Sequence, residues 1–204
     1  LRTGRGPAGA GPAVTGVDRE IQRLLRDLRT GLTPTETAET QWTPEALQKL
    51  MREALPNAEV IILSNREPYI HNRGGDGSIG VQTPASGLVS ALEPVMQACG
   101  GTWIAHGSGS ADRETVDGQD RLTVPPNDPS YVLRRVWVNE EEQDGYYYGL
   151  ANEGLWPLCH IAFVRPVFRD SDWAFYERIN KRFAEAVARE AQTEDPVVLV
   201  QDYH

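Results

Sequence analysis

Two short apolar runs constrain the fold of this chain more than any other feature. Val60–Leu63 and Val197–Val200 contain no polar side chain. Uninterrupted runs of this length are typical of strands that are buried on both faces of a parallel sheet. Further strands are predicted at residues 102–105 and 132–138, and helices at residues 86–96 and 172–191. Because strands and helices alternate, the sequence predicts an α/β fold with a doubly wound, mostly parallel sheet.

Polar residues follow both apolar runs directly. Ser64-Asn65-Arg66 follows the first run, and Gln201-Asp202-Tyr203-His204 follows the second. The carboxyl ends of parallel strands form the edge of the sheet at which α/β proteins bind ligands. An arginine at this edge suits an anion, and the carboxylate of Asp202 suits the hydroxyls of a sugar. On these residues alone, a surface role for Arg66 and a helix-capping role for Asp202 explain the sequence equally well.

The chain divides into three predicted parts. Residues 1–16 are rich in glycine and predict a disordered tail. Residues 17–57 predict a helical extension with two helices, the second of which has Thr43 as its N-cap. We expect this extension to pack on the main domain at residues 58–204, and a regulatory or oligomerising role is the alternative. Because the sequence ends where the sheet would meet its ligand, we also expect that the polypeptide is truncated there.

Charge and residue usage exclude several classes of protein. The formal net charge is −9, which argues against a nucleic-acid-binding surface because such a surface needs clustered Lys and Arg. No run approaches the roughly 20 apolar residues of a membrane-spanning helix. The two cysteines are far apart and lack CxxC spacing, which favours a reduced, cytoplasmic protein. The four histidines lack the spacing of a zinc site, so we expect neither a metal nor a cofactor.

Aromatic residues are concentrated in one region. Residues 131–183 contain 12 of the 16 Phe, Trp and Tyr side chains, and residues 146–157 are the densest part. Rings with polar atoms suit sugars, which present apolar faces and hydroxyl edges, although packing is the better expectation on composition alone.

Two glycine-containing segments suggest anion sites. The segment HNRGGDGS at residues 71–78 predicts a mobile loop or a weak phosphate cradle. The turn before Ser86-Gly87-Leu88 is suited to pointing a helix N-terminus at an anion.

Several motifs within residues 58–204 occur in the order of one known family. They are Ser64-Asn65-Arg66, Ala85-Ser86-Gly87-Leu88, GTWIAHG with Trp103, YYYGLANEGLWPLCH at 146–160, the helical pattern of Trp173, Tyr176, Asn180 and Phe183, and Gln201-Asp202-Tyr203-His204. Through these motifs the chain resembles the trehalose-6-phosphate synthase family of retaining glycosyltransferases. The block at 146–160 is the most specific match, and residues 1–57 lie outside the resemblance.

The resemblance implies the N-terminal, Rossmann-like domain of a GT-B type glycosyltransferase. In this family that domain binds the acceptor, glucose 6-phosphate, and a C-terminal domain binds a nucleotide-sugar donor such as UDP-glucose. Glucose is transferred with retention and without a metal, by attack on the face that the leaving phosphate occupied. The 204-residue chain, which lacks the donor domain, is therefore not expected to turn over alone, and a homo-oligomer is compatible with the resemblance.

The resemblance also assigns roles by motif position. Arg66, Tyr147 and Trp156 would contact the acceptor phosphate. Asp202 would bind acceptor hydroxyls and is the expected catalytic residue. Ser86 and Gly87 would form the loop that closes over the phosphates of the donor.

Two positions depart from the family pattern. Ser86 stands in place of one glycine of a pair, and His106 stands where the family often has a tryptophan. His106 leaves open a different phosphorylated acceptor, such as glycerol 3-phosphate. The altered loop and the N-terminal extension leave open a non-catalytic regulatory subunit that binds a sugar phosphate.

Overall fold

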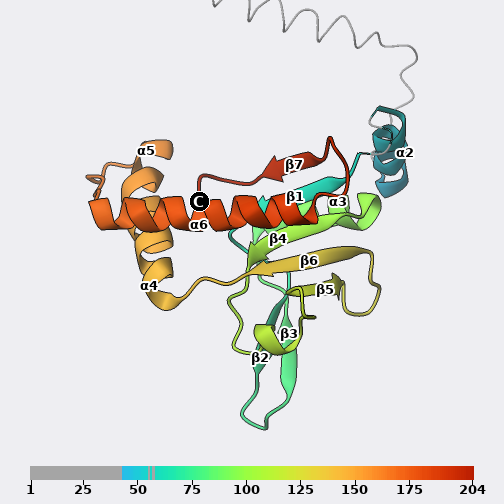
Figure 1. Cartoon of the computed structure of the whole chain (residues 1–204), viewed down its shortest axis with the longest axis horizontal. Coiled ribbons are helices and arrows are strands. Elements are labelled where there is room, and N and C mark those ends of the chain that lie inside the picture. The colour runs from blue at the N-terminus through green and yellow to red at the C-terminus, as the bar shows by residue number, and fades with distance from the viewer. Residues whose placement is uncertain (1–42, 55, 57) are drawn as a thin grey trace, which may run out of the picture. The chain divides into compact units, whose positions relative to one another are not determined.

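The computed structural model describes residues 43–54, 56 and 58–204 (Figure 1). The predicted tail at 1–16 and the first of the two helices predicted within residues 17–57 lie outside these residues. The main sheet has the strand order β5-β6-β4-β1-β7. Its strands are β1 (Val60–Ser64), β4 (Thr102–His106), β5 (Arg121–Val124), β6 (Tyr131–Val136) and β7 (Val197–Val200). All neighbouring strands are parallel except β5, which pairs antiparallel with β6.

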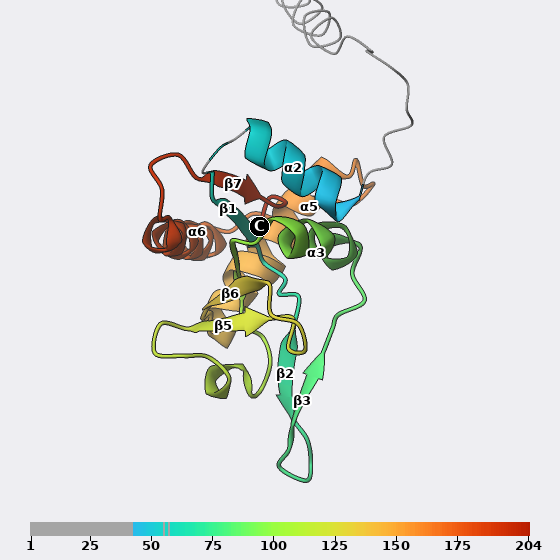
Figure 2. The same cartoon turned by 90° about the vertical axis from the view of Figure 1, so that its right-hand side faces the viewer.

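Helices cover both faces of this sheet, as Figure 2 shows. The helices α2 (Pro44–Ala54) and α3 (Gly87–Cys99) lie on one face, and α6 (Asp170–Glu190) lies on the other with η2 (Asp144–Leu155). Alternate residues of β1 serve the two cores, because Val60 and Ile62 pack towards α3 while Ile61 packs towards α6. The predicted doubly wound, mostly parallel α/β sheet is therefore confirmed.

The helix α2 begins as its sequence predicts. The Thr43 hydroxyl accepts a hydrogen bond from the backbone N–H of Ala46 at 3.2 Å, which is the geometry of an N-cap. The side chain of Gln48 donates to the carbonyl of Ala98, at 3.0 Å, and so attaches α2 to α3. Shorter elements complete the described residues: η1 (Asp112–Glu114), α4 (Glu140–Gln143) and α5 (Trp156–Cys159). Within the described ranges, no helix has the length and apolar character needed to cross a bilayer.

Two expectations about local structure are wrong. Residues 71–78 are not simply a loop, because β2 (Ile70–Arg73) and β3 (Ile79–Gln82) form an antiparallel hairpin across them, which projects from the sheet in Figure 1. The apolar run of β7 is not buried on both faces: among the described residues it lies at the sheet edge, and 61% of the Val200 surface is exposed. An apolar run in the sequence shows that a strand is able to be buried on both faces. The position of that strand in the sheet, however, depends on its pairing with strands far away in the sequence.

Gly101, between α3 and β4, is expected to tolerate no side chain. Its φ of +100° is unfavourable for other residues, and a Cβ atom would overlap the backbone carbonyl of Val60. We expect Gly101→Ala to lower the free energy of unfolding by about 3 kcal/mol, from backbone strain together with the overlap. Urea unfolding followed by tryptophan fluorescence measures this. Gly118→Ala is the matched control, because Gly118 has open space around its Cα and should change stability by less than about 0.5 kcal/mol. Equal stability of the two variants would contradict the prediction.

Candidate active site

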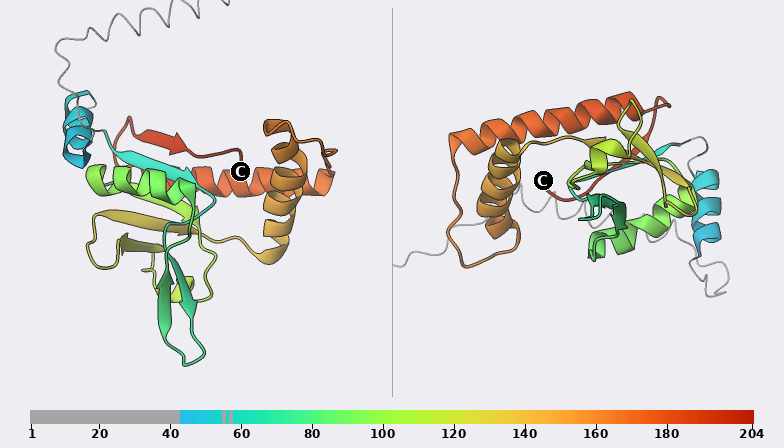
Figure 3. Two further views of the ribbon diagram at one scale, coloured as in Figure 1. Left: turned by 180° about the vertical axis from the view of Figure 1, so that it is seen from behind. Right: turned by 90° about the horizontal axis from the view of Figure 1, so that it is seen from below.

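A cavity of about 660 Å³ opens at the carboxyl edge of β1 and β7. Figure 3 shows the C-terminal end of the described chain lying there between η2 and α3. All six residues singled out from the sequence line this cavity: Arg66, Ser86, Gly87, Tyr147, Trp156 and Asp202. The other lining residues are Ser64, Asn65, Leu88, Ala91, Leu92, Asn152, His160, Gln201, Tyr203 and His204. The structure thus brings the predicted residues together, and their individual roles remain predictions.

Arg66 is presented to the cavity by the polar end of β1. The hydroxyl of Ser64 accepts a hydrogen bond from the indole N–H of Trp103 at 2.8 Å and donates to the Arg66 carbonyl at 2.7 Å. The backbone of Arg66 is therefore held, while its side chain is exposed. Within the described part of the chain, no hydrogen bond or ion pair engages the guanidinium. Such a group is suited to bind an anion that enters the cavity.

Asp202 lies opposite, in the turn that follows β7. Its φ of +70° is unusual for a residue other than glycine, although Asp tolerates this region better than most. One carboxylate oxygen accepts a hydrogen bond from the backbone N–H of Tyr203 at 2.9 Å. The other carboxylate oxygen lies 3.7 Å from Nδ1 of His204, and because Asp202 is exposed its carboxylate is able to accept hydrogen bonds from hydroxyl groups of a ligand as well.

The dense aromatic segment forms a wide helix along the cavity. Residues 144–155 adopt the π-helix η2, and α5 continues it. Tyr147, Asn152 and Trp156 are five and four residues apart, a spacing that places side chains on one face of a helix with i→i+5 hydrogen bonds. The opposite face meets α6 through small residues: a Cβ atom at Gly145 or Gly149 would overlap side chains of that helix. Close contact on one face therefore leaves the aromatic face to the cavity.

Aromatic stacking orders the wall of the cavity. The ring of Tyr147 stacks on His204 with centroids 5.0 Å apart, and Trp156 stacks on His160 at 4.8 Å. Burial lowers the pKa of His204; the carboxylate of Asp202 opposes this shift and the positive charge of Arg66 adds to it. His204 is therefore neutral at pH 7 and is able to exchange hydrogen bonds with a neutral hydroxyl.

The N-terminus of α3 closes another side of the cavity. Ser86 is its N-cap residue, but the Ser86 side chain makes no capping hydrogen bond. The first N–H groups of a helix that has no such cap are available to an anion, which the helix dipole also favours. Ser86 and Gly87 both line the cavity at this point.

Sequence reasoning gave no role to two polar residues of the 146–160 motif. Asn152 and His160 line the cavity, although neither was assigned a contact with a ligand. Both lie in the block at 146–160 and recur with the helical spacing of Tyr147 and Trp156. This spacing could have indicated that the four side chains share one face of a helix, but only if a helix had been predicted at these residues.

His106 lies behind the cavity rather than on it. It is buried at the end of β4 and borders a smaller cavity of about 220 Å³, which Arg66 and Tyr147 also line. Burial lowers the pKa of His106, so the ring is neutral at pH 7. Both cysteines, Cys99 and Cys159, are free thiols. In the described ranges, no three His, Cys, Asp or Glu side chains gather as a metal site would require.

Solved structures show which class of protein has this architecture. A trehalose 6-phosphate synthase from Burkholderia multivorans superimposes with a TM-score of 0.53 at 26% identity, over 72% of this chain and 29% of that one. An E. coli relative whose structure holds UDP-2-fluoro glucose gives a TM-score of 0.52 at 23% identity, over 72% and 28% of the two chains, and supports the fold alone. With the cavity at the carboxyl edge of its sheet, the described domain has the Rossmann-like architecture of GT-B type glycosyltransferases.

Sequence comparison gives the particular family. The model of glycosyltransferase family 20 matches residues 58–204, and the chain belongs to this family. Trehalose-6-phosphate synthase of Mycobacterium avium (strain 104) is 36% identical over 147 residues, and that of Mycobacterium ulcerans (strain Agy99) is 35% identical over 151 residues. These alignments cover 72% and 74% of this chain. The chain spans only 29% of the length of either relative.

Proposed function

We propose that this chain provides the acceptor-binding part of an enzyme that transfers glucose from a nucleotide sugar to glucose 6-phosphate. The product would be trehalose 6-phosphate, formed with retention of configuration. The observation that carries the proposal is the shared cavity lined by Arg66, Tyr147, Trp156 and Asp202. It combines a cation that has no partner among the described residues, phenol and indole donors, and a carboxylate. Together these groups match a phosphate at one end of a sugar and hydroxyls at the other.

Each side chain has a distinct part in the proposed reaction. The guanidinium of Arg66 binds the acceptor phosphate, with hydrogen bonds from the Tyr147 hydroxyl and the Trp156 indole N–H. Asp202 accepts hydrogen bonds from sugar hydroxyls and so fixes the orientation of the ring. The backbone N–H groups at the start of α3, beside Ser86 and Gly87, face the phosphates of the donor.

Transfer then depends on positioning more than on a side-chain base. The bond from glucose C1 to the donor phosphate breaks, and a bond from C1 to the acceptor oxygen forms on the same face. The departing phosphate takes the proton of the acceptor hydroxyl, so the charges balance. Orientation and electrostatic stabilisation are the two effects that a site of this composition is able to supply.

Solved structures of relatives support the proposed substrates. A trehalose-phosphate synthase from Burkholderia xenovorans, 24% identical to this chain, has been solved in complex with glucose-6-phosphate, and the E. coli structure holds a UDP-glucose analogue. UDP-glucose is accordingly our proposed donor. We further propose a cytoplasmic location, which two free thiols support.

The test is an acceptor panel with the full-length protein. UDP-glucose is incubated with glucose 6-phosphate, glycerol 3-phosphate or glucose, and the products are identified by mass spectrometry and by the anomeric coupling in NMR spectra. We expect trehalose 6-phosphate with an α,α linkage, from glucose 6-phosphate alone. Product from glycerol 3-phosphate only would assign the other acceptor, and calorimetric binding without transfer from any nucleotide-glucose would indicate a regulatory subunit.

A further inference from the structure

Residues 65–71, which include Arg66, are held to the rest of the domain by hydrogen bonds on both sides of Arg66. The Asn65 carbonyl accepts a hydrogen bond from the His106 backbone N–H at 3.3 Å, and the Asn65 side chain accepts one from the Tyr146 hydroxyl at 2.7 Å. Further along, the backbone N–H of His71 donates to the Asp112 carboxylate at 2.7 Å. These contacts fix the backbone on both sides of Arg66.

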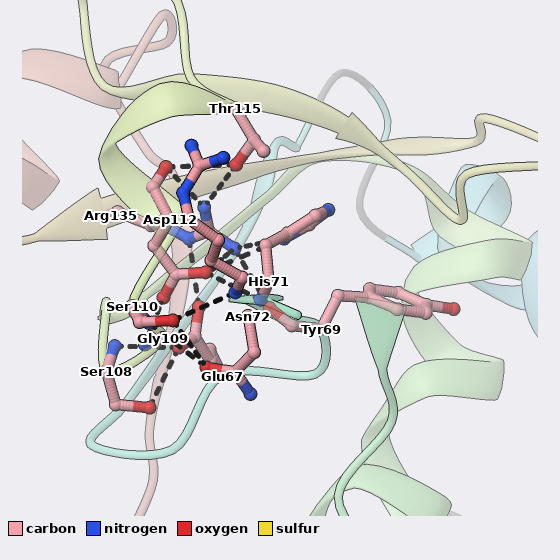
Figure 4. A network of polar contacts seen from close by, with 11 residues as sticks. Glu67, Tyr69, His71, Asn72, Ser108, Gly109, Ser110, Asp112, Thr115 and Arg135 are labelled. Carbon is pink, nitrogen blue, oxygen red and sulfur yellow. Dashed lines mark hydrogen bonds and ion pairs between the residues drawn. The ribbon is translucent and has the colours of Figure 1, made fainter. Parts of the chain in front are cut away.

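Glu67, the residue after Arg66, is the most deeply anchored member of this segment. Its side chain is turned away from solvent, with 2% of the residue surface exposed. One oxygen accepts hydrogen bonds from the backbone N–H of Ser108 at 2.8 Å and from the Ser108 hydroxyl at 3.0 Å. The other oxygen accepts from Nε of Arg135, on β6, at 2.9 Å (Figure 4). Glu67 therefore joins the strand end that carries Arg66 to the loop after β4 and to β6.

Arg135 extends the same anchoring. Its side chain is fully buried and donates to the carbonyl of Tyr69 at 3.0 Å, to His71 Nδ1 at 2.8 Å and to the carbonyl of Asp112 at 2.8 Å. Glu67 thus points inwards and the Asn65 side chain is hydrogen-bonded, whereas Arg66 itself is exposed. A protein with this arrangement presents the guanidinium from a rigid backbone.

We propose that Glu67 is a positioning residue for Arg66, which holds the phosphate-binding guanidinium at the cavity through the buried cluster of Glu67, Ser108 and Arg135. This inference rests on the proposed function. Its physical basis is preorganisation: backbone that is already fixed loses no further entropy when the ligand binds. Glu67 also lines the smaller cavity behind Arg66 but makes all its described contacts within the protein.

The charges in the cluster give the inference a pH signature. One guanidinium, that of Arg135, serves two buried carboxylates, because Asp112 also lies 2.9 Å from it. Burial raises the pKa of Glu67 to about 8, the hydrogen bond with Asp112 adds to the rise, and Ser108 and Arg135 oppose it. Several other titratable groups lie against this cluster or line the cavity beside it: His71, Arg66, His106 and Tyr147. Burial lowers the pKa of both histidines, so neither changes charge above pH 7.

The sign of the pH effect follows from this arrangement. Glu67 is protonated below about pH 8 and becomes negative above it, which adds a charge that repels the acceptor phosphate. The phosphate itself is already doubly ionised from about pH 7 to 9, since its second pKa is near 6. The affinity of the wild-type protein for glucose 6-phosphate should therefore fall roughly threefold from pH 7 to 9. The affinity of Glu67→Gln, which has no such proton, should stay constant.

A double-mutant cycle tests whether Glu67 acts through Arg66. Calorimetry at pH 7 measures the binding of glucose 6-phosphate to the full-length protein, to Arg66→Ala, to Glu67→Ala and to the double variant. We expect Glu67→Ala to weaken binding about fivefold when Arg66 is present and less than about twofold when Arg66 is absent. Glu67→Gln should restore most of the affinity, and binding of unphosphorylated glucose should not respond to either position.

Glu114→Ala is the matched control. It removes an exposed carboxylate that pairs with Arg73 on the hairpin, and it should leave the affinity for glucose 6-phosphate unchanged.

The contrary outcomes distinguish the inference from the proposed function. If Arg66→Ala weakens binding but Glu67→Ala has the same effect with and without Arg66, the inference is wrong and the proposed site stands. If the wild-type protein does not bind glucose 6-phosphate, both are overturned. Should Glu67→Ala fail to fold, Ser108→Ala replaces it in the cycle, and an equal effect of Ser108→Ala in the presence and absence of Arg66 overturns the inference.

Discussion

Replacement of Arg66 by alanine is expected to weaken the binding of glucose 6-phosphate roughly 10- to 100-fold, or about 1.5–3 kcal/mol. The expectation follows from the exposed guanidinium at the end of β1, which has no protein partner within the described residues. A charged hydrogen bond to phosphate has no substitute in the variant, because the remaining phosphate-facing donors proposed here, Tyr147 and Trp156, are neutral. Isothermal titration calorimetry with the full-length protein at pH 7 measures the loss.

Three controls define the cause of this loss. Arg66→Lys keeps the charge but loses the two-pronged geometry, so its affinity should be intermediate. Arg73→Ala removes an exposed arginine from the β2–β3 hairpin, outside the cavity, and should have no effect. Binding of unphosphorylated glucose should be unchanged in Arg66→Ala. An unchanged affinity of Arg66→Ala for glucose 6-phosphate would remove Arg66 from the site.

Replacement of Arg135 by methionine is expected to be the most destabilising of these substitutions. Methionine keeps much of the buried volume, so the change isolates the loss of the polar contacts. Asp112 would lose the cation that pairs with it inside the protein, and the side chain of Glu67 and the carbonyl of Tyr69 would each lose a hydrogen-bond donor. Removing one partner of a buried ion pair costs about 3–5 kcal/mol, and urea unfolding at pH 7 measures this as a shift of the midpoint.

A matched surface substitution identifies the origin of this loss. Arg135 and its partners Glu67 and Asp112 are buried from water, so the effect of Arg135→Met on stability should greatly exceed that of removing an exposed arginine. Arg189→Met is the matched control, since Arg189 is exposed and its pair with Glu185 is a surface contact worth less than about 1 kcal/mol. A loss below about 1 kcal/mol for Arg135→Met would show that the cluster contributes little to stability.

The edge of the sheet was predictable because local patterns define it. The apolar run of β1 and the polar residues after it identify a strand end, and parallel pairing brings such ends to one edge. These local patterns alone locate Ser64-Asn65-Arg66 and the Asp202 turn at that edge. The resemblance to a family then added Tyr147 and Trp156, which composition alone assigned to packing.

Other features depend on contacts between residues far apart in the chain. No local pattern in residues 144–155 predicts a π-helix. In the structure this helix, η2, packs closely against α6 at small residues such as Gly149. Glu67 and Arg135 are 68 residues apart, and each alone reads as an ordinary charged residue.

By itself, the sequence determined the principal strands β1, β4, β6 and β7, the helices α2, α3 and α6, and the polar strand ends that follow β1 and β7, because these depend on periodicity over a few residues. Tertiary structure alone decided that Arg135 is buried beside two acidic side chains, and that Glu67 points inwards while Arg66 is exposed. The physical reason is that burial and pairing of a charge depend on which distant strands become neighbours, and no local pattern contains that order.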